Sequence, residues 1–509
     1  MPNNSTNQKV ESNDHHFNTD HLKENLKERS VKGGAITMIA QFSKLVLQIG
    51  SNVFLARLLT PSDFGLVAMV TVVATFIIMF KDMGLSQATV QKAEINHAQI
   101  STLFWINVLF GLFVMLITWS LAPAIASFYH EPALEAITIA LAFGLFIGGL
   151  TVQHQALLRR QMRFKELSIV EVSSMFSGVV AGIVTAWMGF GYWALVILQI
   201  TQASVMMIGV WYFSKWRPGL PVRNSGIGSM LAFGGYMTTY GFINYFARNL
   251  DTILIGRRWG AEPVGLYSRA YSLLLLPIGQ LTAPFSGVAV PALSRLQDEP
   301  EQFTNYYLKT IKIIAYVSMP MIISMAILAH EIVYIVLGDQ WNGAAELFQI
   351  LAIAAFWQPI ASTTGWIYVS LGNVRRMMLW GLIGTSVMAT AIVIGLPWGA
   401  SGVALAYSIS MWLLIYPLFS FAFYNTPLDV KSLLLTLKYP IVVGMASGIG
   451  FYLAHQILVE QNIAISFFGT LFGGFLSLGF VTVLWKSLRD DMFGIFSSVK
   501  NILKKKNGK

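Results

Sequence analysis

The feature that most constrains this chain is the length of its uncharged segments. Roughly fourteen apolar stretches of about 20 residues follow one another between Ile36 and Trp485. A bilayer core about 30 Å thick is crossed by about 20 helical residues, and unpaired backbone groups are not tolerated in lipid. The chain is therefore predicted to be an all-α polytopic membrane protein.

Composition narrows the classes of function. Only 11% of the 509 residues are charged, against about 25% in soluble proteins. The net charge of +10 could suggest nucleic acid, but the cations cluster at helix ends on one side, as cytoplasmic loops require. The absence of cysteine excludes disulfides and thiolate metal sites. No catalytic set, cofactor motif or metal cluster stands out, so we expect neither an enzyme nor a nucleic-acid-binding protein.

The links between the apolar segments give an orientation. The predicted spans are 36–56, 64–83, 101–122, 134–156, 167–188, 192–213, 229–256, 265–290, 310–337, 346–371, 374–396, 400–424, 436–459 and 463–485. Alternate links carry basic clusters such as Arg159–Arg160 and Arg375–Arg376, whereas the others carry almost no cations. The positive-inside rule then places both termini in the cytoplasm. The longest outward link, 123–133, is too short for an extramembrane domain.

The two ends of the chain differ from its middle. Residues 1–30 are polar and are predicted to form a disordered cytoplasmic tail. Residues 486–509 are basic, with apolar residues at helical spacing, and are predicted to form an amphipathic helix on the inner leaflet.

A shift of 200 residues brings two segments into register. Arg57, Gly65 and Leu66 then coincide with Arg257, Gly265 and Leu266. The match pairs the first predicted span with the seventh, and an even number of spans between them gives a parallel repeat. In transporters built this way, substrates bind between the halves, which rock to alternate access.

Each of the two related spans carries a polar stripe at helical spacing. In the first span the stripe consists of Gln41, Lys44, Gln48 and Ser51. In the seventh it consists of Tyr240, Asn244, Arg248 and Asp251. The repeat places Lys44 over Asn244, and Gln48 over Arg248. A cavity between the halves would be lined by both stripes.

Lys44 lies about 12 Å along its span at 1.5 Å per residue. A charge near the bilayer centre costs about 2.5–3.5 kcal/mol, so it needs a wet cavity or a partner. Lys44 either lines an anion-accepting cavity or pairs with a carboxylate or carbonyl group and locks two helices together.

Other charged residues leave similar alternatives open. Arg248 and Asp251, three residues apart, either neutralise each other or serve as a gate or ion-coupling element. Arg269 could face the cavity or the outer interface. Glu331 is a second candidate for ion coupling. His154 and His455 are isolated, which is more typical of structural histidines than of proton carriers.

Several stretches resemble the multidrug/oligosaccharidyl-lipid/polysaccharide (MOP) exporter superfamily, and within it the polysaccharide transporters of the Wzx type, including the colanic acid exporter branch. The stretches are LARLLTPSDFGLVAM, MGLSQATVQK, NYFARNLDTILIGRRWGAEPVGLYSRAYSLLLLPIGQL, VAVPALSRLQDEPE and EIVYIVLGDQWNGAAELFQILA. The resemblance implies a V-shaped fold with an N-lobe at 31–225, a C-lobe at 226–425 and two appended helices at 426–485.

The resemblance also implies a substrate class. Such proteins move undecaprenyl-diphosphate-linked oligosaccharides across the bacterial inner membrane for exopolysaccharide, capsule or O-antigen synthesis. Lys44, Arg248 and Arg269 would then contact the diphosphate, and Gln41, Gln48, Tyr240 and Asn244 would line the sugar cavity. Expected partners are membrane lipids, the polymerase and export machinery, and a coupling ion, H⁺ or Na⁺, carried by Asp251 or Glu331.

Three rival functions remain open. A drug/cation antiporter of the same superfamily would need a cavity rich in carboxylates, whereas the deep charge of the first span is cationic. A flippase for the peptidoglycan precursor would handle similar chemistry. A membrane-bound polymerase or ligase would need a larger outward loop than this chain offers.

Overall fold

The computed structural model describes residues 26–82, 95–222 and 249–485, together with positions 17, 86, 89, 90, 92 and 489. All regular structure in these ranges is helical. The chain divides into two compact units, Met1–Gly265 and Leu266–Lys509. The predicted lobe boundary at 225/226 and both predicted tails, apart from Phe17, Leu26–Ser30 and Arg489, fall outside the described residues and stay predictions.

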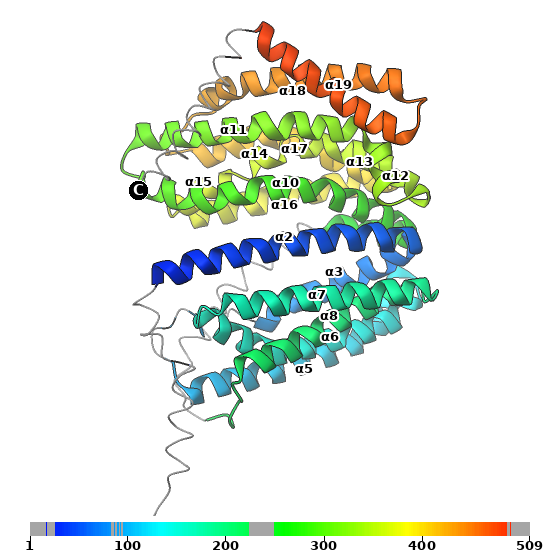
Figure 1. Cartoon of the computed structure of the whole chain (residues 1–509), viewed down its shortest axis with the longest axis vertical. Helices are drawn as coiled ribbons and strands as arrows, with labels where there is room; N and C mark the ends of the chain where they lie inside the picture. Colours follow the sequence, from blue (N-terminus) through cyan, green and yellow to red (C-terminus); the bar gives the residue numbers. More distant parts are fainter. Residues whose placement is uncertain are drawn as a thin grey trace, which may run out of the picture. The chain divides into compact units, whose positions relative to one another are not determined.

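The first unit is a bundle of long helices (Figure 1). They are α2 (Leu26–Leu58), α3 (Pro61–Asp82), α5 (His97–Tyr129), α6 (Ala133–Arg160), α7 (Phe164–Trp187) and α8 (Trp193–Ser214), with residues 249–259 also helical. α5 packs along α6, α7 along α8, and α2 along α7. α2 begins ten residues before the predicted span, since its first turns are polar.

The second unit begins within α10 (Ala261–Arg295). It continues through α11 (Pro300–Ile327), α12 (Ala329–Val336), η2 (Asp339–Trp341), α13 (Asn342–Ala355), α14 (Gln358–Ala361), α15 (Thr364–Ser370), α16 (Val374–Gly395), η3 (Leu396–Trp398), α17 (Gly399–Phe423), α18 (Val430–Leu458) and α19 (Ile463–Leu484). α18 packs against both α11 and α19 (Figure 1).

Local sequence fixes where α5 begins. At α5, the Asn96 side chain accepts from the Gln99 backbone N–H at 2.9 Å, and the Gln99 side-chain oxygen accepts from the Asn96 backbone N–H, which forms a capping box. The helix continues through Pro123 to Tyr129. The predicted outward link 123–133 is therefore reduced to the three residues between α5 and α6.

The described helices include ten that are long and apolar enough to cross a membrane, or eleven if one bent pair is a single span. One of the ten, Val374–Phe423, contains α16 and α17, which pack against each other as a hairpin. The predicted spans 64–83 and 229–256 lie partly on residues whose side chains or backbone are not described. The polytopic all-α fold is confirmed, and the total of fourteen stays a prediction.

Two predicted spans are interrupted in the structure. The span predicted at 310–337 divides at Leu328 into α11 and α12. The span predicted at 346–371 consists of α13, α14 and α15, with a bend of 44° between Asp339–Ala355 and Gln358–Ser370. Broken helices expose backbone groups, which are tolerated at membrane depth only where protein or a wet cavity surrounds them.

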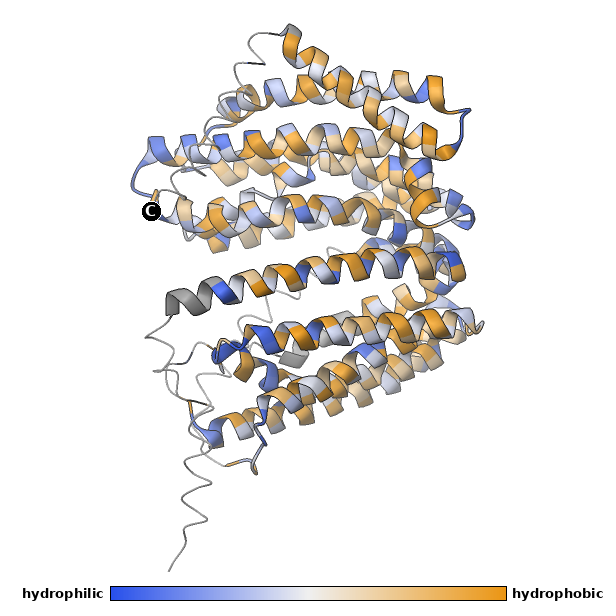
Figure 2. Cartoon of the chain, in the orientation of Figure 1, coloured by the Kyte–Doolittle hydropathy of each residue, from blue (hydrophilic) through white to orange (hydrophobic). Residues whose placement is uncertain are grey.

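The surface of the helices is apolar as well as their interior. Met38, Phe42, Trp187 and Ile457 are each more than 60% exposed, and hydrophobic residues cover the outward sides of most helices (Figure 2). Helices that are apolar around much of their circumference are typical of a lipid environment. A buried core in the second unit joins α11, α15, α17 and α18.

A reciprocal glycine contact supports the internal repeat. A Cβ atom at Gly65 would collide with the carbonyl oxygen of Ala261, and one at Gly265 would collide with that of Pro61. In the 200-residue register, Gly65 matches Gly265 and Pro61 matches Ala261, so each segment makes the same contact with the other. Such self-complementarity is what a two-fold axis produces, and both segments lie in the first unit.

Candidate functional site

Lys44 pairs with a carboxylate in the first unit. Its Nζ lies 2.6 Å from Oε2 of Glu171 on α7, and each side chain is 23% exposed. This contact joins α2 to α7 and neutralises Lys44 within the helix pair. The expected alternative of a carboxylate partner is therefore observed, and a role in binding anions stays a prediction.

The other members of the first stripe remain accessible. Gln41 and Gln48 are exposed and lie about one turn to either side of Lys44 on α2, whereas Ser51 is buried. The amides present donors and acceptors beside a partly exposed ion pair. This arrangement offers hydrogen bonds to both phosphate and hydroxyl groups.

The second predicted stripe is only partly described. Tyr240, Asn244 and Arg248 lie outside the described residues. Asp251 is buried on the helical segment 249–259, where its Oδ1 accepts from the Thr252 backbone N–H at 2.6 Å. Its suggested pairing with Arg248 stays a prediction.

Arg269 lies on α10 in the second unit and is partly buried. Tyr271, two residues later on the same helix, belongs to a cluster of polar side chains. The hydroxyl of Tyr271 lies 3.2 Å from that of Tyr407 on α17, and the Gln358 amide donates to it at 3.4 Å. All three side chains are half-buried. Gln358 begins α14, directly after the break that follows α13, so this cluster forms where the helix is interrupted.

Glu331 contacts two other helices of the second unit. Its Oε1 lies 2.8 Å from His455 Nε2 on α18 and accepts from the Ser466 hydroxyl on α19 at 2.7 Å. The residue is only 5% exposed, and Oε2 has no hydrogen-bond partner among the described residues. The structure therefore joins Glu331 with His455, which the sequence had left isolated.

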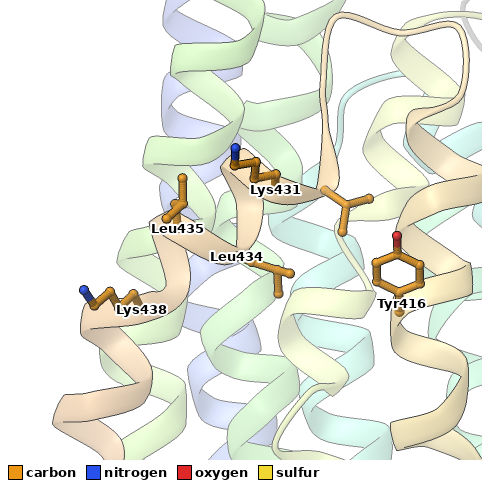
Figure 3. A pocket seen from close by; sticks show the side chains of 6 residues that line it. Tyr416, Lys431, Leu434, Leu435 and Lys438 are labelled. Carbon is orange, nitrogen blue, oxygen red and sulfur yellow. The ribbon is translucent and has the colours of Figure 1, made fainter.

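A surface pocket lies elsewhere in the second unit. It has a volume of about 420 Å³ and lies between α17 and α18. Figure 3 shows Lys431, Leu434, Leu435 and Lys438 on one helix and Tyr416 on another, with Leu434 pointing toward Tyr416. It is open and mostly apolar, and none of the predicted site residues lines it. It is therefore separate from the candidate transport site.

Four candidates for the transport site were missed from the sequence: Glu171, Gln358, Tyr271 and Tyr407. Glu171 was visible as an acidic residue in the first half of its predicted span, at a depth compatible with Lys44 in the first half of its own. Pro359 signalled the helix break beside Gln358. No sequence signal marked Tyr271, since tyrosines are frequent in membrane helices.

Comparison with known proteins assigns the family. The model of the family described as "Polysaccharide biosynthesis protein" matches residues 54–346, more than half of the chain. The chain belongs to this family. The predicted resemblance to proteins of polysaccharide biosynthesis is thereby confirmed.

Relatives named as biosynthesis proteins match most of the chain. The "Lipopolysaccharide biosynthesis protein WzxC" of Escherichia coli K12 is 26% identical over 75% of this chain and 78% of its own length. The "Teichuronic acid biosynthesis protein TuaB" of Bacillus subtilis 168 is 26% identical over 83% and 88%. The solved structure of "Lipid II flippase MurJ" superposes with a TM-score of 0.71 at 13% identity, covering 89% of this chain and 99% of that one. The structural likeness establishes a shared fold.

Proposed function

We propose that this protein is a transporter that moves undecaprenyl-diphosphate-linked oligosaccharide units from the cytoplasmic to the periplasmic leaflet by alternating access. Membership of the polysaccharide biosynthesis family is the observation that carries the proposal. The parallel repeat with its reciprocal glycine contact supports a two-lobed rocking mechanism. The links between α5 and α6, α7 and α8, and α18 and α19, which the charge pattern predicts to face outward, are short, and this disfavours a polymerase or ligase.

Lys44 would serve as a contact for the diphosphate. Because Glu171 already neutralises it, the substrate phosphate would have to replace this carboxylate as its partner. Such an exchange keeps Lys44 paired but leaves Glu171 without its cation, so the contacts made by the substrate would have to offset the cost of that carboxylate. Gln41 and Gln48, one turn away on each side, would donate hydrogen bonds to phosphate or sugar oxygens.

The sugar would be contacted by hydroxyl and amide groups in the second unit. Tyr271, Tyr407 and Gln358 combine aromatic faces with hydrogen-bonding groups, and Arg269 on α10 adds a guanidinium that can bind phosphate bidentately. Tyr240, Asn244 and Arg248 remain proposed members of the cavity. The lipid tail would stay in the bilayer.

A flux assay would test this function. The purified protein is placed in proteoliposomes with a fluorescent undecaprenyl-diphosphate-linked oligosaccharide, and headgroup movement is followed with an external quencher. Time-dependent translocation is expected. Export of a cationic dye without oligosaccharide movement would instead favour the antiporter, and movement of lipid II alone would favour a peptidoglycan-precursor flippase.

Variants would separate the two roles of Lys44. Loss of a charge-assisted hydrogen bond costs about 1.5–3 kcal/mol, so Lys44→Ala should raise the half-saturating substrate concentration about tenfold to a hundredfold. Glu171→Gln removes the competing carboxylate and should lower that concentration. Lys431→Ala, in the separate pocket, is the matched control and should leave it unchanged. A Glu171→Gln protein that binds substrate no better would contradict the exchange.

A further inference from the structure

The cluster of Glu331, His455 and Ser466 is a buried ionisable site that joins three helices in the described part of the second unit. It brings together α12, α18 and α19, although Glu331 is separated from His455 by 124 residues. α18 and α19 form the pair that ends the described chain, and Glu331 connects them to the short helix that follows the break at Leu328. The cluster thus lies where the terminal pair meets the rest of the unit.

The charge of the cluster depends on how many protons it holds. When Glu331 is ionised, its Oε1 accepts from Ser466 and from His455 in the tautomer that carries a proton on Nε2. With Nδ1 of His455 unprotonated, the cluster carries one negative charge. One added proton, on Nδ1 or on the unpartnered Oε2 of Glu331, makes it neutral.

Neighbouring charges do not compensate for this change. α19 carries no charged residue between Ile463 and Leu484. The other ionisable groups around the cluster, on α12, η2, α13, α18 and the link after it, are all exposed: His330, Tyr334, Asp339, Glu346, Tyr452 and Glu460. α11 carries Tyr316 near its middle and its charges in the first half: Glu301, Lys309 and Lys312. Within the described residues, the hydrogen bonds of Glu331 come from His455 and Ser466.

We propose that Glu331, His455 and Ser466 form a proton-binding site that couples protonation to the packing of α18 and α19 against α12. In the proton-bound state the cluster is neutral and the three helices stay joined. When the proton leaves, a buried carboxylate is left without a full counter-charge, which weakens the contact because burial of an uncompensated charge is costly. The site lies at the ends of α18 and α12 that the charge pattern predicts to face outward, where the proton concentration outside the cell can act on it.

The coupling role rests on the transport function proposed above, and it assigns H⁺ rather than Na⁺ as the coupling ion. Imidazole is the side chain that most readily changes charge between pH 5 and 8. One carboxylate and one hydroxyl supply few oxygen atoms, the ligands that hard metal cations prefer.

Two measurements test the site. In proteoliposomes, the flux of the oligosaccharide lipid is recorded with and without a pH gradient at a fixed membrane potential. For the wild type, the gradient should change flux at least about fivefold, the lower end of ordinary coupling between sites. Glu331→Gln and His455→Gln should retain slow movement and lose this dependence. His330→Gln, an exposed histidine beside Glu331, is the matched control and should keep it.

The second measurement needs no substrate. The melting temperature of the purified protein is followed from pH 5.5 to 8.5. The wild type and His330→Gln should lose stability as pH rises, whereas Glu331→Gln should not. Equal pH profiles for wild type and Glu331→Gln would overturn the proton site, even if flux is normal. A failure of all flux would overturn the transport function and leave the melting result to decide on proton binding.

Discussion

Glu171 and Glu331 are two carboxylates within apolar helices, and the protein neutralises them differently. Glu171 pairs with a lysine and is partly exposed, whereas Glu331 is buried against a histidine and a serine. An ammonium group keeps its charge across the physiological pH range, while an imidazole does not. We therefore expect Lys44 to exchange Glu171 for another anion while both groups stay charged. We expect the contact between Glu331 and His455 to stay in place while its charge changes.

The largest expected effect comes from breaking the permanent pair. Lys44→Met leaves Glu171 without its cation and should lower the free energy of unfolding by about 1–3 kcal/mol, the penalty for a buried polar group that has lost its partner. Lys44→Met with Glu171→Leu should recover most of this loss. Denaturant titration in detergent measures both. A double variant as unstable as the single one would show that the two side chains act independently.

Exchanging lysine and histidine between the two pairs should exchange their pH dependence. Lys44→His gives Glu171 a titratable partner, so its contribution should be present below about pH 6.5 and lost as the pH rises. His455→Lys should remove pH dependence from the other pair. Melting curves between pH 5.5 and 8.5 are the measurement. If His455→Lys melts with the wild-type profile, another group controls the pH response.

The smallest effect is expected at the opposite end of α18. Asp429 caps this helix through hydrogen bonds from the hydroxyl and backbone N–H of Ser432, and these bonds hold the pKa of Asp429 below its ordinary value of 3.8. Its stabilising effect is therefore present above pH 3.8 and lost as pH falls through the lowered pKa. Asp429→Ala should be slightly less stable than wild type at neutral pH, and the difference should vanish in strong acid. A difference that grows in acid would contradict the cap.

The sequence predicted the helices better than their contacts. Hydropathy located the spans because a membrane helix must be apolar along about 20 residues. It did not reveal the break at Leu328, where no proline or glycine marks the interruption. The pairing of Lys44 with Glu171 was open rather than assigned, since periodicity identifies the face of a helix and not the helix opposite.

The candidate site was predictable to a similar extent. Lys44 and Glu331 were selected because an ionisable residue in an apolar span needs a hydrated cavity or a partner. The partners His455 and Ser466 lie more than 120 residues away from Glu331 along the chain, and a single sequence carries no record of that proximity. Tyr271 and Gln358 meet only because α13 and α14 are separated by a bend.

The contact between Gly65 and Gly265 bears on how such a molecule could have arisen. A half-length chain with an even number of spans would insert in one orientation, and two copies could associate about a common axis. A methyl group added at that glycine would then clash twice, once in each copy. After fusion of two genes the same change costs only one clash, so the joined chain is freer to let its halves diverge.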